Sequence, residues 1–134
     1  IEWIIKTELL EPIKPLLNAG MIFEAIVLML NNITANSVFY KKALKLEGAV
    51  TFNQIAMKCV YEMFMNIISE KSTGKKSKYR WLTPEVISTY YAQSLCFITE
   101  GWIAQGMDDI EPKEMAEAYM YLITRSMDDI LSEL

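Results

Sequence analysis

Hydrophobic residues recur at helical spacing along almost the whole chain, and no segment has the alternation of a β-strand. A first short helix is expected from Ile1 to about Leu10, ended by Pro12 and Pro15, which cannot continue a helix. Asn18 is then a suitable N-cap for a helix that runs from Ala19 to about Asn36.

The middle of the chain predicts two more helices. The segment "SVFYKKALKL" predicts one short amphipathic helix, closed by Gly48 in the position that a helix C-terminus favours. From Ala49 to Lys71 apolar residues fall on nearly every face, which is typical of a helix at the centre of its domain. The stretch "STGKKSKYRWL" breaks the periodicity and predicts an exposed, flexible loop.

Two helices complete the chain. Thr83 caps a helix that starts with Pro84 at its first position and runs to Gln105, with Gly106 as its stop. Pro112 opens the final helix, from about 112 to 132. The pattern therefore predicts one all-α domain of about six helices that spans residues 1–134.

The last two helices are each apolar over about 180° of their circumference, where a surface helix needs only about 100°. This surplus predicts that they pack against a second copy of the chain, and a thick monomeric core is the alternative. The interface residues expected on this basis are Leu95, Ile98, Trp102, Ala118, Met120, Tyr121 and Met127.

Composition narrows the class of protein. Hydrophobic residues make up 52% of the chain, and the net charge of −4 argues against a chain that binds nucleic acid as a whole. The longest apolar block, Ala19 to Leu30, contains Glu24 and is shorter than the ~20 residues of a membrane helix. Cys59 and Cys96 lie within apolar helical patterns, which predicts unpaired, buried thiols and a cytoplasmic location.

Enzymatic chemistry is not expected. The chain has no histidine, which excludes the catalytic triads and the ordinary zinc sites, so we expect no catalytic residue, metal or cofactor. The stretch "TGKKS" lacks the first glycine of a phosphate-binding loop. Its neighbourhood, residues 71–80, holds five cations and is expected to be a solvated loop, with contact to nucleic acid or an acidic partner as the alternative.

Methionines and aromatic residues suggest a cavity for a small apolar or amphipathic ligand, with plain core as the alternative. Three glutamates interrupt apolar helices; Glu24 and Glu100 are expected at solvent edges, and Glu62 is expected to line the cavity. The predicted pocket residues are Met57, Tyr61, Glu62, Phe64, Met65, Tyr90, Tyr91 and Phe97.

The run "WIAQGMDDIEPKEMA", from Trp102 to Ala116, resembles the end of the regulatory domain of TetR-family transcriptional regulators. The resemblance is to a subgroup, common in Firmicutes, that includes regulators like those of dihydroxyacetone kinase. Its helix ending in Trp and Gly is matched by Trp102 to Gly106, and its next helix start by Pro112, Glu114, Met115 and Ala116. At Glu111 the family usually has a capping Ser or Thr, and a Glu caps less well.

A second match is "NSVFYKKAL", in which Phe39, Tyr40 and Lys41 resemble a helix start of the same subgroup, followed by Gly48 and Phe52. With the helix order, the resemblance covers nearly the whole chain. The chain begins with "IEWII" and without a methionine, so it is expected to be a fragment that lacks the family's N-terminal helix-turn-helix domain.

The resemblance implies a homodimer through a four-helix bundle built from the last two long helices of each subunit. It also implies an effector cavity among the central helices, whose occupancy alters dimer geometry, and contact with DNA only through the missing N-terminal domain. A protein-interaction adaptor without a small-molecule ligand is the alternative.

Overall fold

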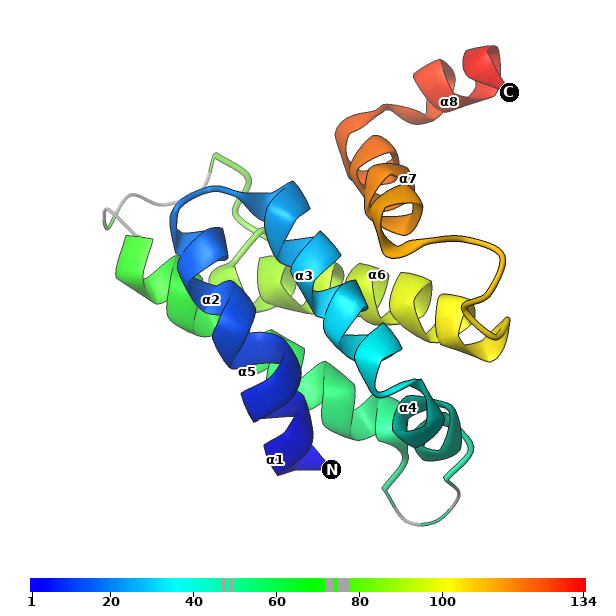
Figure 1. The fold of residues 1–134 in the computed structure, drawn as a ribbon. Helices are drawn as coiled ribbons and strands as arrows, with labels where there is room; N and C mark the ends of the chain where they lie inside the picture. Colours follow the sequence, from blue (N-terminus) through cyan, green and yellow to red (C-terminus); the bar gives the residue numbers. More distant parts are fainter. Residues whose placement is uncertain (47, 49, 72–73, 75–77) are drawn as a thin grey trace.

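The computed structural model describes residues 1–46, 48, 50–71, 74 and 78–134. All regular structure in these residues is helical (Figure 1), which confirms the all-α prediction. The elements are α1 (Glu2–Ile4), η1 (Ile5–Leu10), α2 (Glu11–Asn18), α3 (Ile22–Ala35), α4 (Ser37–Leu44), α5 (Phe52–Lys71), α6 (Pro84–Ala104), α7 (Pro112–Thr124) and α8 (Met127–Glu133). Because α1, η1 and α2 follow one another without a break, the described residues form seven separate helices.

The first helix does not stop near Leu10, so that prediction was wrong. It continues to Asn18, with Pro12 in the first turn of α2 and Pro15 inside it. The chain widens to a π-helix over η1, where the N–H of Glu11 bonds to the oxygen of Lys6. A wide turn of this kind relieves the clash between a proline ring and the carbonyl of the preceding turn.

The predicted N-cap at Asn18 was also wrong, because Asn18 is the last residue of α2. The chain turns at Gly20, whose φ of 77° lies in the left-handed region, and α3 begins at Ile22. The glycine allows a turn that a residue with a side chain would adopt only under strain.

The helices predicted in the middle of the chain agree better with the structure than the first helix does. Helix α4 covers the start of "SVFYKKALKL", although it ends at Leu44, four residues before the predicted stop at Gly48. Helix α5 occupies most of the predicted 49–71, and residue 49 lies outside the described residues. The predicted flexible loop falls partly on residues 72–73 and 75–77, which also lie outside them.

Helix α6 starts as predicted. The Thr83 hydroxyl accepts a hydrogen bond of 3.2 Å from the N–H of Val86, and Pro84 occupies the first turn. The helix ends at Ala104, and Gly106 turns the chain with a φ of 98°. The prediction of this helix and of its two ends is confirmed.

The single final helix predicted over about 112–132 is divided in two. Helix α7 ends at Thr124, Arg125 is extended, and the Ser126 hydroxyl accepts a 3.1 Å hydrogen bond from the N–H of Asp129 to start α8. Serine is a strong N-cap and two aspartates follow in the first turn, where they complement the helix dipole. Local capping therefore overrides the continuous apolar pattern.

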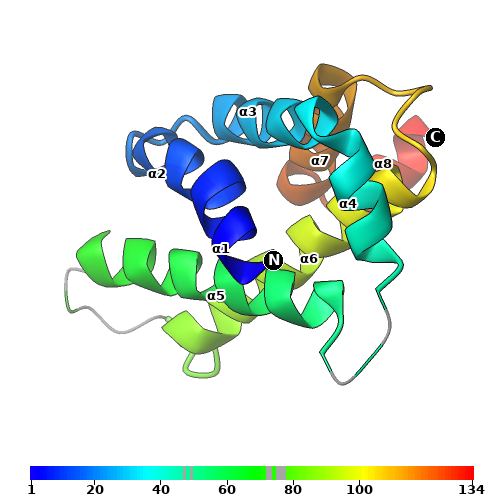
Figure 2. The ribbon, with the colours of Figure 1, turned by 60° about the horizontal axis from the view of Figure 1, so that its bottom comes forward.

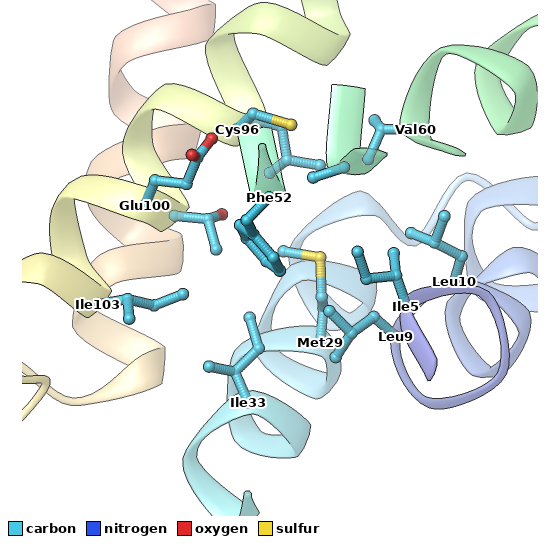
Figure 3. A pocket seen from close by; sticks show the side chains of 13 residues that line it. Ile5, Leu9, Leu10, Met29, Ile33, Phe52, Val60, Cys96, Glu100 and Ile103 are labelled. Atoms are coloured by element: carbon cyan, nitrogen blue, oxygen red, sulfur yellow. The ribbon is translucent and has the colours of Figure 1, made fainter. Parts of the chain in front are cut away.

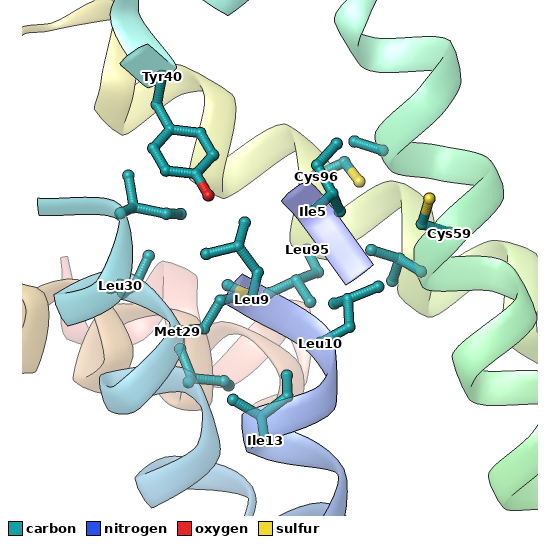
Figure 4. Close-up of a cluster of buried hydrophobic side chains, with 14 of the residues drawn as sticks. Ile5, Leu9, Leu10, Ile13, Met29, Leu30, Tyr40, Cys59, Leu95 and Cys96 are labelled. Atoms are coloured by element: carbon teal, nitrogen blue, oxygen red, sulfur yellow. The ribbon is translucent and has the colours of Figure 1, made fainter. Parts of the chain in front are cut away.

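Helices α5 and α6 pack along one another, and the α1–η1–α2 rod, α3 and α4 complete a layered bundle around the core (Figure 2). The N-terminus lies beside α5, where the Lys58 ammonium donates a hydrogen bond of 3.0 Å to the Glu2 carboxylate. Side chains of the rod, α3, α5 and α6 interlock at the centre, as Figure 4 shows. Helix α7 packs on α3, whereas α8 extends away and contributes no buried residue (Figure 1).

Cys59 and Cys96 are free and buried, which confirms the prediction of unpaired thiols. Among the described residues no single helix is long and apolar enough to cross a membrane; only α3 and α4 together, bent by 90°, meet the criteria of length and composition.

Candidate functional site

A small cavity of about 30 Å³ lies at the centre of the bundle (Figure 3). Its walls come from η1, α3, α5 and α6, and the lining residues are Ile5, Leu9, Leu10, Met29, Ile33, Phe52, Ala56, Val60, Leu95, Cys96, Thr99, Glu100 and Ile103. Cavities that hold small-molecule ligands are roughly 300–1,000 Å³. In this conformation the cavity has room for a molecule the size of water.

The polar end of the cavity comes from one turn of α6, where Thr99 and Glu100 follow each other. The Thr99 hydroxyl is buried and has no hydrogen-bond partner among the described residues. The Glu100 carboxylate accepts a 2.6 Å hydrogen bond from the side-chain amide of Asn53. Burial raises the pKa of Glu100, and the bond from Asn53 partly offsets that effect.

Glu100 also lines a groove of about 480 Å³ on the outer side of the same helices, between α4, α5 and α6. The groove is bounded by Leu44, Asn53, Met57, Gln93, Phe97, Glu100, Gly101 and Ala104. Glu100 is therefore the residue shared by the interior cavity and the open groove, and its partner Asn53 lies on the groove side.

The structure distributes the predicted pocket residues over several places. Met57 and Phe97 line the outer groove. Phe64 lines a separate cavity of about 60 Å³ between α2, α3, α5, α6 and α7. Tyr61 packs partly against the core, and Met65 is half-buried.

Glu62 does not line the central cavity. Its carboxylate lies 3.5 Å from the Lys6 ammonium on the surface, where it borders a shallow groove. Of the other two glutamates, Glu24 is exposed as expected, whereas the half-buried Glu100 takes the place at the cavity that the sequence suggested for Glu62. Glu62 and Glu100 both interrupt apolar helices, so the pattern of each helix alone does not separate them, and the packing decides which one reaches the cavity.

Tyr90 and Tyr91 lie on the outer side of α6 rather than in the core. They line an open groove of about 680 Å³ that also includes Trp81, Leu82 and Val86. Tyr90 and Phe97 are 63% and 75% exposed, which is unusual for aromatic side chains one helical heptad apart.

The predicted interface residues also differ in where they lie: some are buried in the subunit and others are exposed. Trp102 and Leu95 are buried within the subunit, and the Trp102 indole donates a 2.8 Å hydrogen bond to the oxygen of Ile110. These two residues are therefore unavailable to a partner subunit. Ile98 and Met120 are partly buried against the same core.

Ala118 and Met127 are exposed, and Tyr121 is partly buried. The Tyr121 hydroxyl donates a hydrogen bond to Glu133, and its ring contacts the Arg125 guanidinium. The sequence predicted an apolar surface over about half of the circumference of α6, and α6 has apolar residues both inside and outside the core. The prediction assigned the two sides of α6 in reverse, since Trp102 faces inward and Phe97 outward.

Each of the two long helices therefore leaves apolar or small residues exposed. On α6 they are Tyr90, Phe97, Gly101 and Ala104, and on α7 they are Ala118 and Leu122. The two helices are joined by a 2.8 Å hydrogen bond between the hydroxyls of Ser94 and Tyr119. We call these six residues the α6–α7 face.

Gly101 has no role that the subunit itself explains. It lies within α6, and apart from its own helix backbone and its chain neighbours no atom lies within 4 Å of the place that a Cβ would occupy. A glycine inside a helix costs about 1 kcal/mol relative to alanine. Close approach of another backbone is one of the uses of glycine, and such an approach has to come from outside the subunit.

The basic segment lies partly outside the described residues, which include Lys71, Lys78 and Arg80 but not Lys75 and Lys76. Lys71 donates a 2.8 Å hydrogen bond to the oxygen of Asn18, and Lys78 lies 5.8 Å from the Tyr79 ring centre. The described residues contain no group of three or more histidine, cysteine or acidic side chains that could hold a metal ion.

Comparison with known families places most of the chain in a family. The family model TetR_C_8, described as "Transcriptional regulator C-terminal region", matches residues 21–125. Comparisons with curated proteins and with solved structures found no significant match. The matched region runs from the start of α3 to the end of α7 and contains the outer groove and the α6–α7 face.

Proposed function

The chain belongs to the TetR_C_8 family of transcriptional regulator C-terminal regions, and on this premise we propose that it senses an effector and dimerises. In the full-length regulator a DNA-binding domain would precede α1. Effector binding would change the geometry of the dimer and thereby the spacing of the two DNA-binding domains. The finer assignment to the subgroup like the dihydroxyacetone-kinase regulators is part of this proposal.

The observation that carries the dimer is Gly101, a helical glycine that faces open space within the subunit. It lies between the exposed Phe97 and Ala104, so a partner helix could approach the α6 backbone closely. Four helices, α6 and α7 from each subunit, would then form the bundle. A two-fold interface brings the same surface of both copies together, which suits a face with both large and small residues.

The test is the mass in solution, measured by light scattering after size exclusion. We expect a dimer for the wild-type chain and a monomer for Phe97→Glu and Gly101→Leu, because a charge or a bulky side chain blocks close approach. Val38→Glu is the matched control, since Val38 is 65% exposed on α4 and outside the α6–α7 face. A wild-type monomer at tens of micromolar would overturn the dimer.

The effector part of the proposal rests on the family match, and the size of the central cavity indicates what effector binding would require. At about 30 Å³ the cavity cannot hold a ligand unless α5, α6 and η1 separate. Ile5, Leu9 and Leu10 of the N-terminal rod line it, so separation would move the end of the chain that leads to a DNA-binding domain. An effector would act by binding the open arrangement more tightly than the closed one.

A protein-interaction adaptor is the second candidate, and the open groove of Trp81, Leu82 and Tyr90 favours it. This groove is larger than the central cavity and apolar, as binding surfaces for proteins often are. Thermal shifts against a panel of metabolites and lipophilic compounds separate the candidates. A specific shift supports the sensor, and one bound protein with no shift from any compound supports the adaptor.

A further inference from the structure

We propose that the effector site is formed by the central cavity and the outer groove together, and that it takes an apolar molecule with a protonated amine. Glu100 is the counter-charge for the amine, and its hydrogen bond to Asn53 closes the passage between the two spaces. This inference rests on the proposed sensor function and specifies its ligand class.

The position of Glu100 is the first support. Its side chain lines both the interior cavity and the outer groove, and the Asn53 amide lies 2.6 Å from its carboxylate. A ligand that entered from the groove would meet the carboxylate first. Donation from the ligand to Glu100 would replace the bond from Asn53, which lies on the exposed side of α5 and can turn to water.

The charge of Glu100 is the second support. Among the described residues no lysine or arginine forms an ion pair with it, whereas Glu2 and Glu62 both pair with Lys6. A half-buried carboxylate without a cation is costly, since burial favours its neutral form. The raised pKa of Glu100 reflects that cost, which a protonated amine would remove.

The remaining walls set the rest of the ligand. Beyond Thr99 and Glu100, the cavity is lined by aliphatic side chains, Phe52, Met29 and Cys96. The outer groove adds Leu44, Met57 and Phe97 and has the volume of a small-molecule site. The two spaces together thus match an apolar body with one cationic end, and the unpaired Thr99 hydroxyl offers a second hydrogen bond beside the carboxylate.

The site also touches the α6–α7 face. Phe97, Gly101 and Ala104 belong to both the outer groove and that face. A partner helix on Gly101 would therefore form one side of the groove. An effector in the groove would touch residues of the dimer contact directly, which links occupancy to dimer geometry without an intermediate element.

Three ten-carbon probes of different charge test the ligand class: decylamine, decanol and decanoate, each below its micellar concentration. Calorimetric titration of the wild-type chain is expected to give at least about tenfold tighter binding for decylamine than for decanol, and the weakest binding for decanoate. Glu100→Gln should remove the advantage of decylamine over decanol. The matched control is Glu24→Gln, a change on the exposed side of α3, which should leave it intact.

A measurement on the wild-type chain alone keeps the proposal testable if Glu100→Gln fails to fold. Lowering the pH from about 8 to about 4 should abolish the preference for decylamine, because Glu100 gains a proton while the amine keeps its own. Equal binding of the three probes, no binding of any probe, or a preference that survives Glu100→Gln would overturn the inference. If light scattering shows a dimer in those cases, only the proposed ligand class is rejected. If it shows a monomer, the proposed function is rejected as well.

Discussion

The side-chain amide of Asn32 in α3 donates a hydrogen bond of 3.0 Å to the main-chain oxygen of Glu8 in η1. Pro12, four residues after Glu8, has no N–H with which to satisfy that oxygen. Asn32 thus supplies a donor where the proline removes one. The Glu8 carboxylate in turn accepts a 3.3 Å hydrogen bond from the buried Tyr40, so Glu8 ties the N-terminal rod to both α3 and α4.

Replacing Asn32 with alanine is expected to lower the free energy of unfolding by about 1–3 kcal/mol, because it leaves a partly buried carbonyl without its donor. Urea denaturation measures the change. Asn31→Ala, one position earlier and exposed on the same helix, is the control and should change stability by less than about 0.5 kcal/mol. Equal effects of the two substitutions would show that the bond to Glu8 contributes nothing.

The hydrogen bond between Ser94 and Tyr119 is expected to couple α6 to α7. In a double-mutant cycle of Ser94→Ala and Tyr119→Phe, we expect a coupling energy of about 0.5–1.5 kcal/mol, because the two hydroxyls are 2.8 Å apart and part-buried. Chemical denaturation of the four proteins gives that energy. Tyr61→Phe is the control, since the described residues include no hydrogen bond to the Tyr61 hydroxyl. Strict additivity would contradict the coupling.

Cys59 and Cys96 should not react with a thiol reagent in the native state. Burial raises the pKa of both thiols, that of Cys96 to about 12, so the reactive thiolate form is disfavoured in both, and neither side chain is open to the reagent. Absorbance after addition of Ellman's reagent should show almost no reaction in buffer and two thiols per chain in guanidinium chloride. Rapid reaction of either cysteine in buffer would mean that the core opens readily.

Glu100 should make the folded state more stable at low pH than at neutral pH. Burial raises its folded pKa above the ordinary value of 4.5, so its contribution is full below that value and is lost as the pH rises through the folded pKa. Glu100→Gln should therefore gain stability relative to the wild-type chain between about pH 4 and neutral pH. Denaturation across a pH series measures this gain, with Glu24→Gln as the surface control. A constant difference at all pH values would exclude it.

Local signals in the sequence predicted much of the fold. Thr83 and Pro84 start α6, Gly106 turns the chain after α6, and Pro112 starts α7. These signals are local, because caps and prolines act through neighbouring backbone groups. The predicted stop before Pro12 failed for a reason that lies outside the local sequence. The donor that satisfies Glu8 comes from Asn32, which is 24 residues away.

In the candidate site, too, some features follow from the local sequence and others only from contacts between distant residues. The sequence by itself determined that the chain is all-helical, that α6 is apolar over about half of its circumference and that both thiols of the chain are unpaired, since these properties follow from spacing and composition. Only the tertiary structure decided that Trp102 faces inward, that Phe97 faces outward and that Glu100 rather than Glu62 reaches the central cavity. A helix whose apolar surface is wider than one core needs does not by itself specify which part faces inward, so contacts with the other helices decide which residues are left for a partner or a ligand.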